Sequence, residues 1–345
     1  MSAINHVRKT GRQLLGALSL LVVCRGASPS PTRSSPLPLV LVADVPLPGN
    51  PVRFDYQDID SSKKRLFIAH MNDASVVVVS TLDGSLVKVI SGIPTPRGVA
   101  VAPEAKRVFV TSSPSQLVLI DSESLTELGR VTTGRSPDGV AWDPGHRVVG
   151  VSDQGDGALS LIADSGTGTR KQVALGRETG NVVFDGGRSV FWLTVVSAVG
   201  PDRLVSVEPL AARIVNTIPL PGCAGAHGLR IHPNGKSALI ACEGNAKVLR
   251  VELAGTHALA LAPSGADPDV LAIDPGLSLL YVAAESGDLR LFDLSKPGLV
   301  LLGQQHAGKG AHSLAVDAVS HHIFFPLAHG PHGAPLLRIM RPASS

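Results

Sequence analysis

The sequence predicts an all-β fold, a seven-bladed β-propeller, and three observations support this prediction. Seven segments follow one template of an apolar strand, a turn, a second apolar strand, a polar loop and a third strand. Successive segments begin 41–47 residues apart, a period expected when each repeat forms one blade of short strands. Turns such as "PEAK", "DPGH" and "DPGL" supply Pro, Asp and Gly where strands reverse. The segments begin at Asp55, Arg97, Asp138, Gly180, His227, Asp269 and His312.

Length and composition agree with a β-rich globular protein of one or two domains. Of the 345 residues, 44% are hydrophobic, which is enough to fill a large core. Only 17% are charged, so the composition is not that of a disordered chain.

The last repeat is one strand short of a blade. Three strands follow His312, and the pattern ends near Arg341. The strand-like stretch "LPLVLVADVPLPG", residues 37–49, precedes the first repeat. We expect it to pair as the outermost strand of blade seven, because this would close the ring and leave no open seam. The predicted propeller therefore spans residues 37–342.

Residues 1–24 have the pattern of an export signal. Basic residues precede a ten-residue apolar core, Leu14–Val23, which is too short to be a membrane-spanning helix. Cys24 follows directly, so the chain is either a lipoprotein acylated at Cys24 or is cleaved a few residues later. The Pro- and Ser-rich residues 25–36 are predicted to form a linker. We therefore expect an exported protein that is periplasmic, extracellular or lipid-anchored to a bacterial envelope.

Charge argues against a nucleic-acid partner. The formal net charge of +3 equals the three basic residues of the signal, which holds no acidic residue. The remaining chain is balanced and lacks the basic excess that binding to phosphates requires. We expect a monomer that meets a membrane only through a lipid at Cys24.

Three repeats resemble the YVTN-type repeats of seven-bladed propellers, a group related to lactonase-like propellers. They are "LFIAHMNDASVVVVSTLDGSLVKVI", "VFVTSSPSQLVLIDSESLTELGRV" and "LYVAAESGDLRLFDLSKPGLVLLG". Tyr281-Val282 matches the Tyr-Val of the family pattern. The family includes exported proteins, a DNA-contacting member, lactone hydrolases and haem-bearing relatives. The resemblance implies the propeller fold over residues 37–342, and the repeat itself carries none of these activities.

The residues that enter the innermost strand of each blade should lie nearest the central axis. Six of the seven are ionisable, and a polar ring on the axis is where propellers bind ligands. We therefore predict a site for a small ligand or a protein partner on this axial face. The alternative is that these residues only cap solvated turns. The predicted axial ring consists of Asp55, Arg97, Asp138, His227, Asp269 and His312.

Part of this ring has the donor types of a metal site. His227, Asp269 and His312 come from three consecutive blades, and imidazole with carboxylate suits a divalent transition metal. One hypothesis is therefore a divalent metal ion as cofactor. Loops after the second strands of their blades contribute Glu243, His70 and His329, which we expect to act as neighbouring partners of the ring.

Blade five contains two cysteines. Cys223 and Cys242 both lie toward the axial face, and in an exported protein they could form a disulfide. The alternative is two separate thiols with Cys242 buried as a small apolar side chain. His232, in the turn "HPNGK", should be solvated on the opposite face and so cannot share a metal with His227.

Two functions from different classes follow. The first is an exported binding or scaffold propeller that presents the axial ring to its ligand. The alternative is a lactonase-like hydrolase, in which Arg97 or a metal polarises a carbonyl and a ring His or Asp activates water. The sequence has no Gly-x-Ser-x-Gly elbow, no phosphate-binding Gly loop and no Cys-x-x-Cys-His motif, which favours the first.

Overall fold

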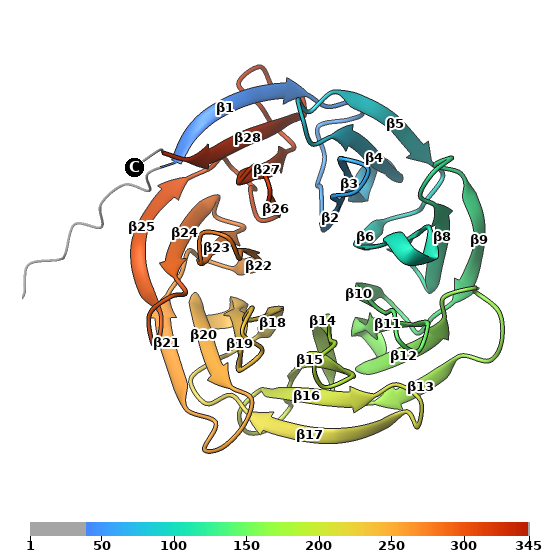
Figure 1. Cartoon of the computed structure of the whole chain (residues 1–345), viewed down its shortest axis with the longest axis vertical. Helices are drawn as coiled ribbons and strands as arrows, with labels where there is room; N and C mark the ends of the chain where they lie inside the picture. Colours follow the sequence, from blue (N-terminus) through green and yellow to red (C-terminus); the bar gives the residue numbers. More distant parts are fainter. Residues whose placement is uncertain (1–38, 344–345) are drawn as a thin grey trace, which may run out of the picture. The chain divides into compact units, whose positions relative to one another are not determined.

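A computed structural model describes residues 39–343 of the chain. These residues form seven four-stranded antiparallel sheets arranged as blades around a central axis (Figure 1). The predicted all-β, seven-bladed propeller is confirmed. The predicted signal, residues 1–24, and the linker, residues 25–36, lie outside the described residues. No helix among the described residues is long and apolar enough to cross a membrane.

Six blades are built from four consecutive strands, with the first strand innermost (Figure 1). Blades one to three consist of β2 (Gln57–Asp60), β3 (Arg65–His70), β4 (Ser75–Ser80) and β5 (Leu86–Ser91); β6 (Pro96–Ala102), β7 (Arg107–Ser112), β8 (Gln116–Asp121) and β9 (Glu127–Thr132); and β10 (Pro137–Asp143), β11 (Val148–Asp153), β12 (Ala158–Ala163) and β13 (Lys171–Ala174). Blades four to six consist of β14 (Glu178–Asp185), β15 (Val190–Val196), β16 (Arg203–Glu208) and β17 (Arg213–Pro219); β18 (Ala226–Ile231), β19 (Ser237–Cys242), β20 (Lys247–Glu252) and β21 (Leu259–Pro263); and β22 (Pro268–Asp274), β23 (Leu279–Ala284), β24 (Asp288–Asp293) and β25 (Val300–His306).

Blade seven combines strands from both ends of the described chain. It consists of β26 (Ala315–Asp317), β27 (His322–Leu327), β28 (Leu336–Pro342) and β1 (Leu39–Pro46). β1 pairs antiparallel with β28, beginning with Leu39 opposite Pro342. The guanidinium of Arg338 donates to both carboxylate oxygens of Asp44, at 2.9 and 2.6 Å. The prediction that an N-terminal strand completes blade seven and closes the ring is therefore confirmed.

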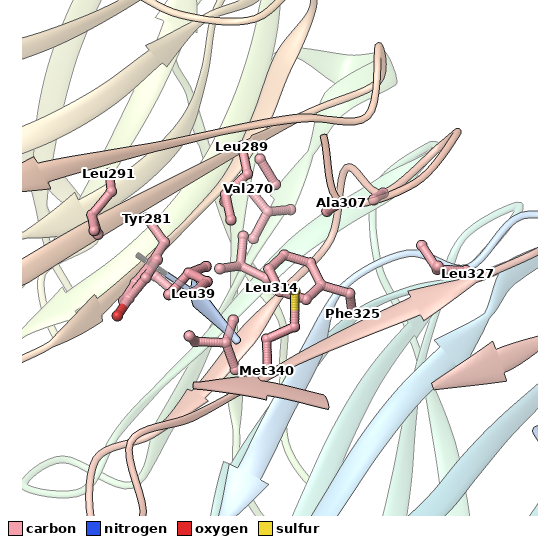
Figure 2. Packing of buried hydrophobic residues seen from close by; sticks show 14 of the residues in the cluster. Leu39, Val270, Tyr281, Leu289, Leu291, Ala307, Leu314, Phe325, Leu327 and Met340 are labelled. Carbon is pink, nitrogen blue, oxygen red and sulfur yellow. The ribbon is translucent and has the colours of Figure 1, made fainter. Parts of the chain in front are cut away.

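Apolar packing between blades holds the ring together. Leu39 is 8% exposed and belongs to the apolar cluster between blades six and seven. Tyr281, Phe325 and Met340 are members of the same cluster (Figure 2). Burial of such side chains is the main stabilising contribution that one blade makes to the next. β1 therefore supplies both hydrogen bonds and core packing.

β-Bulges break the innermost strands at the same place in several blades. The register between the first two strands shifts just after the first residue of β6, β10, β18 and β22, and after the second residue of β14. A bulge bends a strand and re-aims a side chain, and such features recur next to functional sites. Four of the six predicted ring residues lie in these bulges: Arg97, Asp138, His227 and Asp269.

Short 3-10 helices follow the second strand in three blades. They are η1 (Met71–Asp73), η3 (Gln154–Asp156) and η4 (Glu243–Asn245). A fourth, η2 (Pro103–Ala105), follows the first strand of blade two. The first three bring loop residues to the end of the axis at which the innermost strands begin.

Candidate functional site

A cavity of about 460 Å³ opens at the axial end where the innermost strands begin. Five of the six predicted ring residues line it, and His312 is buried beside it, 3.4 Å from the lining residue Glu285. We call this cavity the axial pocket. It is lined by Arg53, Asp55, Tyr56, Met71, Arg97, Asp138, Gln154, His227, Glu243, Asp267, Asp269 and Glu285.

Glycines let the innermost strands of neighbouring blades approach each other closely. A Cβ on Gly228 would lie 1.8 Å from the main-chain oxygen of Asp269. A Cβ on Gly98 would lie 2.2 Å from the main-chain oxygen of Asp138. Only a residue without a side chain fits at these two positions. Gly98 and Gly228, which follow Arg97 and His227 in the chain, therefore lie directly against the main chain of Asp138 and Asp269.

Asp138 receives positive charge from two directions. Arg97 donates from Nη1 to Asp138 Oδ1 at 3.4 Å and to Gln154 Oε1 at 2.9 Å. His227 Nε2 lies 3.3 Å from Asp138 Oδ2. Burial alone would raise the pKa of Asp138, but the hydrogen bond and charge of His227, followed by Arg97, hold it below its ordinary value. Asp138 is therefore ionised and paired.

His227 reaches Asp138 across an intervening blade. Gly180 holds the ring position of blade four, so no side chain separates the two groups. Glu243 Oε1 lies 3.7 Å from His227 Nδ1, and Asp269 Oδ1 lies 3.8 Å from Nε2. Burial opposes the charged imidazolium, but Asp138, Asp269 and Glu243 outweigh it and raise the pKa of His227 to about 10. His227 is therefore a cation at neutral pH.

Arg53 and Tyr56 connect blade one to blade six. Arg53 forms an ion pair with Glu285 and lies 3.7 Å from Asp269 Oδ2. Tyr56 donates its hydroxyl to Asp269 Oδ1 at 3.3 Å. Neither Arg53 nor Tyr56 was among the residues predicted for the axial ring. Their position beside Asp55 in the chain was the available signal, but the repeat does not define the course of this loop.

Asp55 is a buried carboxylate without a hydrogen-bond partner among residues 39–343. It is 4% exposed. Burial raises the pKa of Asp55 to about 8, together with the charges of Asp138 and Asp269, which Arg53 and Arg97 only partly offset. At neutral pH the Asp55 carboxyl therefore keeps its proton unless a positive charge binds beside it.

His312 is held in one orientation. It is 3% exposed, and its Nδ1 lies 3.0 Å from the carbonyl oxygen of Gly310 and 3.4 Å from Glu285 Oε2. Nε2 is buried and has no hydrogen-bond partner in the described part of the chain. A proton on Nδ1 satisfies both oxygens, so Nε2 carries the lone pair.

Two groups of candidate metal ligands meet at Asp269. Ligand atoms of Asp55, Asp269 and His312 lie within 4.8 Å of one another, and so do those of His227, Glu243 and Asp269. The structure therefore places the predicted set of His227, Asp269 and His312 in two groups that share Asp269. His227 and His312 do not belong to the same group.

Of the three residues expected to neighbour the ring, Glu243 lies at the axial pocket, whereas His70 and His329 do not. Glu243 lines the axial pocket, and burial raises its pKa to about 7 despite the opposing charge of His227. His70 is buried and stacked on Phe54, with ring centroids 4.0 Å apart, and is not among the lining residues. His329 is exposed and does not line the pocket either.

Three further residues of blade five had predicted roles. The expectation that His232 is solvated is wrong, because it is 9% exposed and its Nε2 lies 3.2 Å from the carbonyl oxygen of Leu294. Cys223 and Cys242 form a disulfide with Cα atoms 5.2 Å apart. The disulfide ties the loop before His227 to the end of β19, directly before Glu243.

The fold and this pocket define a β-propeller with an acidic axial site. No protein-family model matches the chain, and no curated protein matches it. The solved structures that share the fold include the following two. "Kuenenia stuttgartiensis Hydrazine Synthase" gives a TM-score of 0.71 at 15% identity, over 93% of this chain and 100% of that one. "Crystal Structure of Mitotic Checkpoint Complex" gives a TM-score of 0.72 at 12% identity, over 95% of this chain and 98% of that one. At these identities the likeness is one of fold.

Proposed function

We propose that this chain is an exported binding propeller whose axial pocket takes a small, positively charged ligand. One observation carries the proposal: carboxylates line the pocket in excess, and the buried Asp55 among them has no hydrogen-bond donor in the described residues. The pocket holds six carboxyl groups against three cationic side chains, Arg53, Arg97 and the protonated His227. A bound cation would displace the proton that the raised pKa of Asp55 keeps on this carboxyl, and would balance the excess of acidic groups around it.

Each cationic side chain of the pocket already has a carboxylate partner. Arg53 is paired with Glu285, Arg97 with Asp138, and His227 with Asp138. An anionic ligand would have to displace these pairs, whereas a cation would add a partner to Asp55. Charge complementarity therefore favours a cation.

Export and family membership belong to the same proposal. The support for export is the apolar segment Leu14–Val23 and the Cys223–Cys242 disulfide, since disulfides persist mainly in oxidising compartments. The support for the YVTN-type family is the repeat sequence. Mass spectrometry of the protein purified from the producing cells would test export by giving the processed N-terminus and any acylation of Cys24.

Calorimetric titration tests the ligand class. The protein is expressed from its complete reading frame and titrated with Zn²⁺, Mn²⁺, choline, putrescine and, as an anion, gluconate. We expect at least one cation to bind with one-to-one stoichiometry and gluconate not to bind. Asp55→Asn should weaken that binding by about tenfold or more, corresponding to 1.4 kcal/mol or more.

Glu104→Gln is the matched control, because Glu104 is an exposed carboxylate on η2 outside the pocket. It should leave the affinity unchanged. Binding of gluconate alone, or cation binding that Asp55→Asn does not alter, would overturn the proposal.

A lactonase-like hydrolase is the second candidate. It is favoured by the presence of two guanidiniums, Arg53 and Arg97, and an unpaired carboxylate, Asp55, in one pocket. A guanidinium could polarise a lactone carbonyl, and a carboxylate could activate water. It ranks second because both guanidiniums are ion-paired. Turnover of simple lactones that is lost in Arg97→Gln and retained in Glu104→Gln would promote it.

A further inference from the structure

We infer that Asp55, Asp269 and His312 form a site for one divalent transition-metal ion in the wall of the axial pocket. This inference rests on the proposed function, that the pocket takes a cation, and names the cation and its ligands. The three residues come from blades one, six and seven and are 4%, 5% and 3% exposed. Their ligand atoms lie within 4.8 Å of one another.

The His312 ring is arranged as metal-bound histidines are. Such histidines donate the other ring N–H to a carbonyl or carboxylate, which fixes the ring and leaves a basic lone pair for the metal. Here Gly310 and Glu285 both face Nδ1, at 3.0 and 3.4 Å. The remaining nitrogen, Nε2, is buried without a partner in the described part of the chain. A lone pair in this position calls for a proton donor or a metal.

Both carboxylates suit the role of metal ligands. Asp55 receives no hydrogen bond among residues 39–343, so both of its oxygens are free to bind a cation. Asp269 is oriented by the Tyr56 hydroxyl at 3.3 Å and by Arg53 at 3.7 Å. Ligands about 2.1 Å from a tetrahedral zinc lie about 3.4 Å apart, so closure around an ion needs shifts of roughly an ångström.

The donor set indicates the class of metal. One imidazole and two carboxylates suit Zn²⁺, Mn²⁺, Fe²⁺ or Co²⁺, whereas Ca²⁺ and Mg²⁺ favour oxygen ligands alone. Three protein ligands leave at least one coordination position open. The ion could therefore present that position to an oxygen or nitrogen atom of a second molecule in the pocket.

The second ligand group is the weaker candidate. His227 already lies 3.3 Å from Asp138 in addition to Glu243 and Asp269, so its ring is paired with protein carboxylates. His312 Nε2 has no such partner. This difference places the ion with His312.

Metal titration of the full chain tests the inference. The protein is stripped with a chelator, dialysed and titrated with Zn²⁺ by calorimetry, and with Co²⁺ by visible absorption. We expect one ion per chain. Asp55→Asn and His312→Gln should each weaken Zn²⁺ binding at least about a hundredfold, because losing a ligand should cost no less than losing a neighbour of a ligand.

Two other histidine variants locate the ion. His306→Gln is the matched control, since His306 is exposed on β25 of blade six, and it should leave the affinity unchanged. His227→Gln should cost less than His312→Gln. A loss with His227→Gln that equals or exceeds the loss with His312→Gln would overturn the inference. Zn²⁺ binding that is unaltered in both His227→Gln and His312→Gln would overturn the inference too, because the ion would then lie elsewhere.

Two outcomes separate this inference from the proposed function. Binding of choline or putrescine without any metal binding would overturn the metal site and leave the function standing. Binding of no cation at all would overturn both. Should His312→Gln fail to fold, X-ray absorption of the zinc-loaded wild-type protein still decides the question. One imidazole and otherwise oxygen ligands are expected, and two imidazoles would contradict the site.

Discussion

The hydroxyl of Thr111 in blade two donates to the main-chain carbonyl of Asp138 in blade three, at 2.6 Å. The same hydroxyl accepts the amide of Gly98 at 2.7 Å. Thr194 repeats the contact with the carbonyl of His227, also at 2.7 Å. These hydroxyls hold the backbone of one blade against the bulge of the next. These hydrogen bonds therefore fix the main chain that carries the ring side chains of Asp138 and His227.

Thr111→Val should destabilise the protein by about 1–3 kcal/mol, because it leaves the buried Gly98 amide and Asp138 carbonyl unpaired. The free energy of unfolding, measured with denaturant, checks this. Thr132→Val is the control, since Thr132 is exposed at the end of β9. Equal effects of the two substitutions would contradict the role of this contact.

Gly228→Ala should both destabilise the fold and impair cation binding. Its Cβ would meet the main-chain oxygen of Asp269 at 1.8 Å, so blade five or six must move. Overpacking of this kind costs about 1–3 kcal/mol or more. Thermal unfolding and cation titration provide the two readouts. In the control Gly186→Ala the new Cβ meets only a ring carbon of Phe184, at 3.8 Å, and both readouts should be unchanged.

Leu39→Ala should cost about 2–5 kcal/mol, because it opens a cavity in the cluster between blades six and seven. Leu41→Ala, on the same strand, is the matched control. Leu41 is 56% exposed, and its truncation should change the unfolding free energy by about 0.5 kcal/mol or less. Similar losses for the two variants would mean that β1 does not contribute to the core.

Reduction of the Cys223–Cys242 disulfide should lower stability by about 3 kcal/mol, as expected for the 19-residue separation of the two cysteines. Unfolding with and without reductant measures the loss. The double variant Cys223→Ala/Cys242→Ala should be less stable than the wild-type protein and should not respond to reductant. A response in the double variant would point to another cause.

Asp153 should make stability fall between about pH 4 and pH 6. Burial raises the pKa of Asp153 from 3.8 to about 6, despite hydrogen bonds from Ser160, Gly134 and Gln172. The native state therefore holds this proton more tightly than the unfolded chain. Below about pH 4 both states are protonated, and as pH rises to about 6 the native state loses up to about 3 kcal/mol relative to the unfolded state.

Asp153→Asn removes this titration. The difference in unfolding free energy between variant and wild type, measured at pH 4, 5, 6 and 7, should shift in favour of the variant up to about pH 6 and then level off. A difference that is constant with pH would contradict the raised pKa of Asp153.

The repeat predicted the fold because each blade uses the same order of strand, turn and strand. Counting strands after His312 was enough to assign residues 37–49 to blade seven. The ring positions followed from the same template, since each lies at the entry to an innermost strand. The bulges at Arg97, Asp138, His227 and Asp269 were not predicted, because they depend on pairing between strands.

The contacts between ring residues could not be predicted in the same way. Arg53 reaches Glu285 through a loop that the repeat does not define. His227 turns toward Asp138, two blades away, because Gly180 leaves the intervening position empty. The order of the blades along the chain therefore did not predict which ring side chains contact each other. His232 was assigned to solvent because the turn "HPNGK" does not reveal its contact with Leu294 in blade six.

The pairing of β1 with β28 has a consequence for how the protein becomes functional. β1 and β28 are the first and last strands of the described chain and pair with each other, so the ring cannot close until β28 has been synthesised and, for an exported chain, translocated. Asp55 and His312 lie in blades one and seven, on either side of that seam, and Asp269 lies in the next blade. The proposed cation site joins blades on both sides of the closure, so its occupancy would report that the ring has closed.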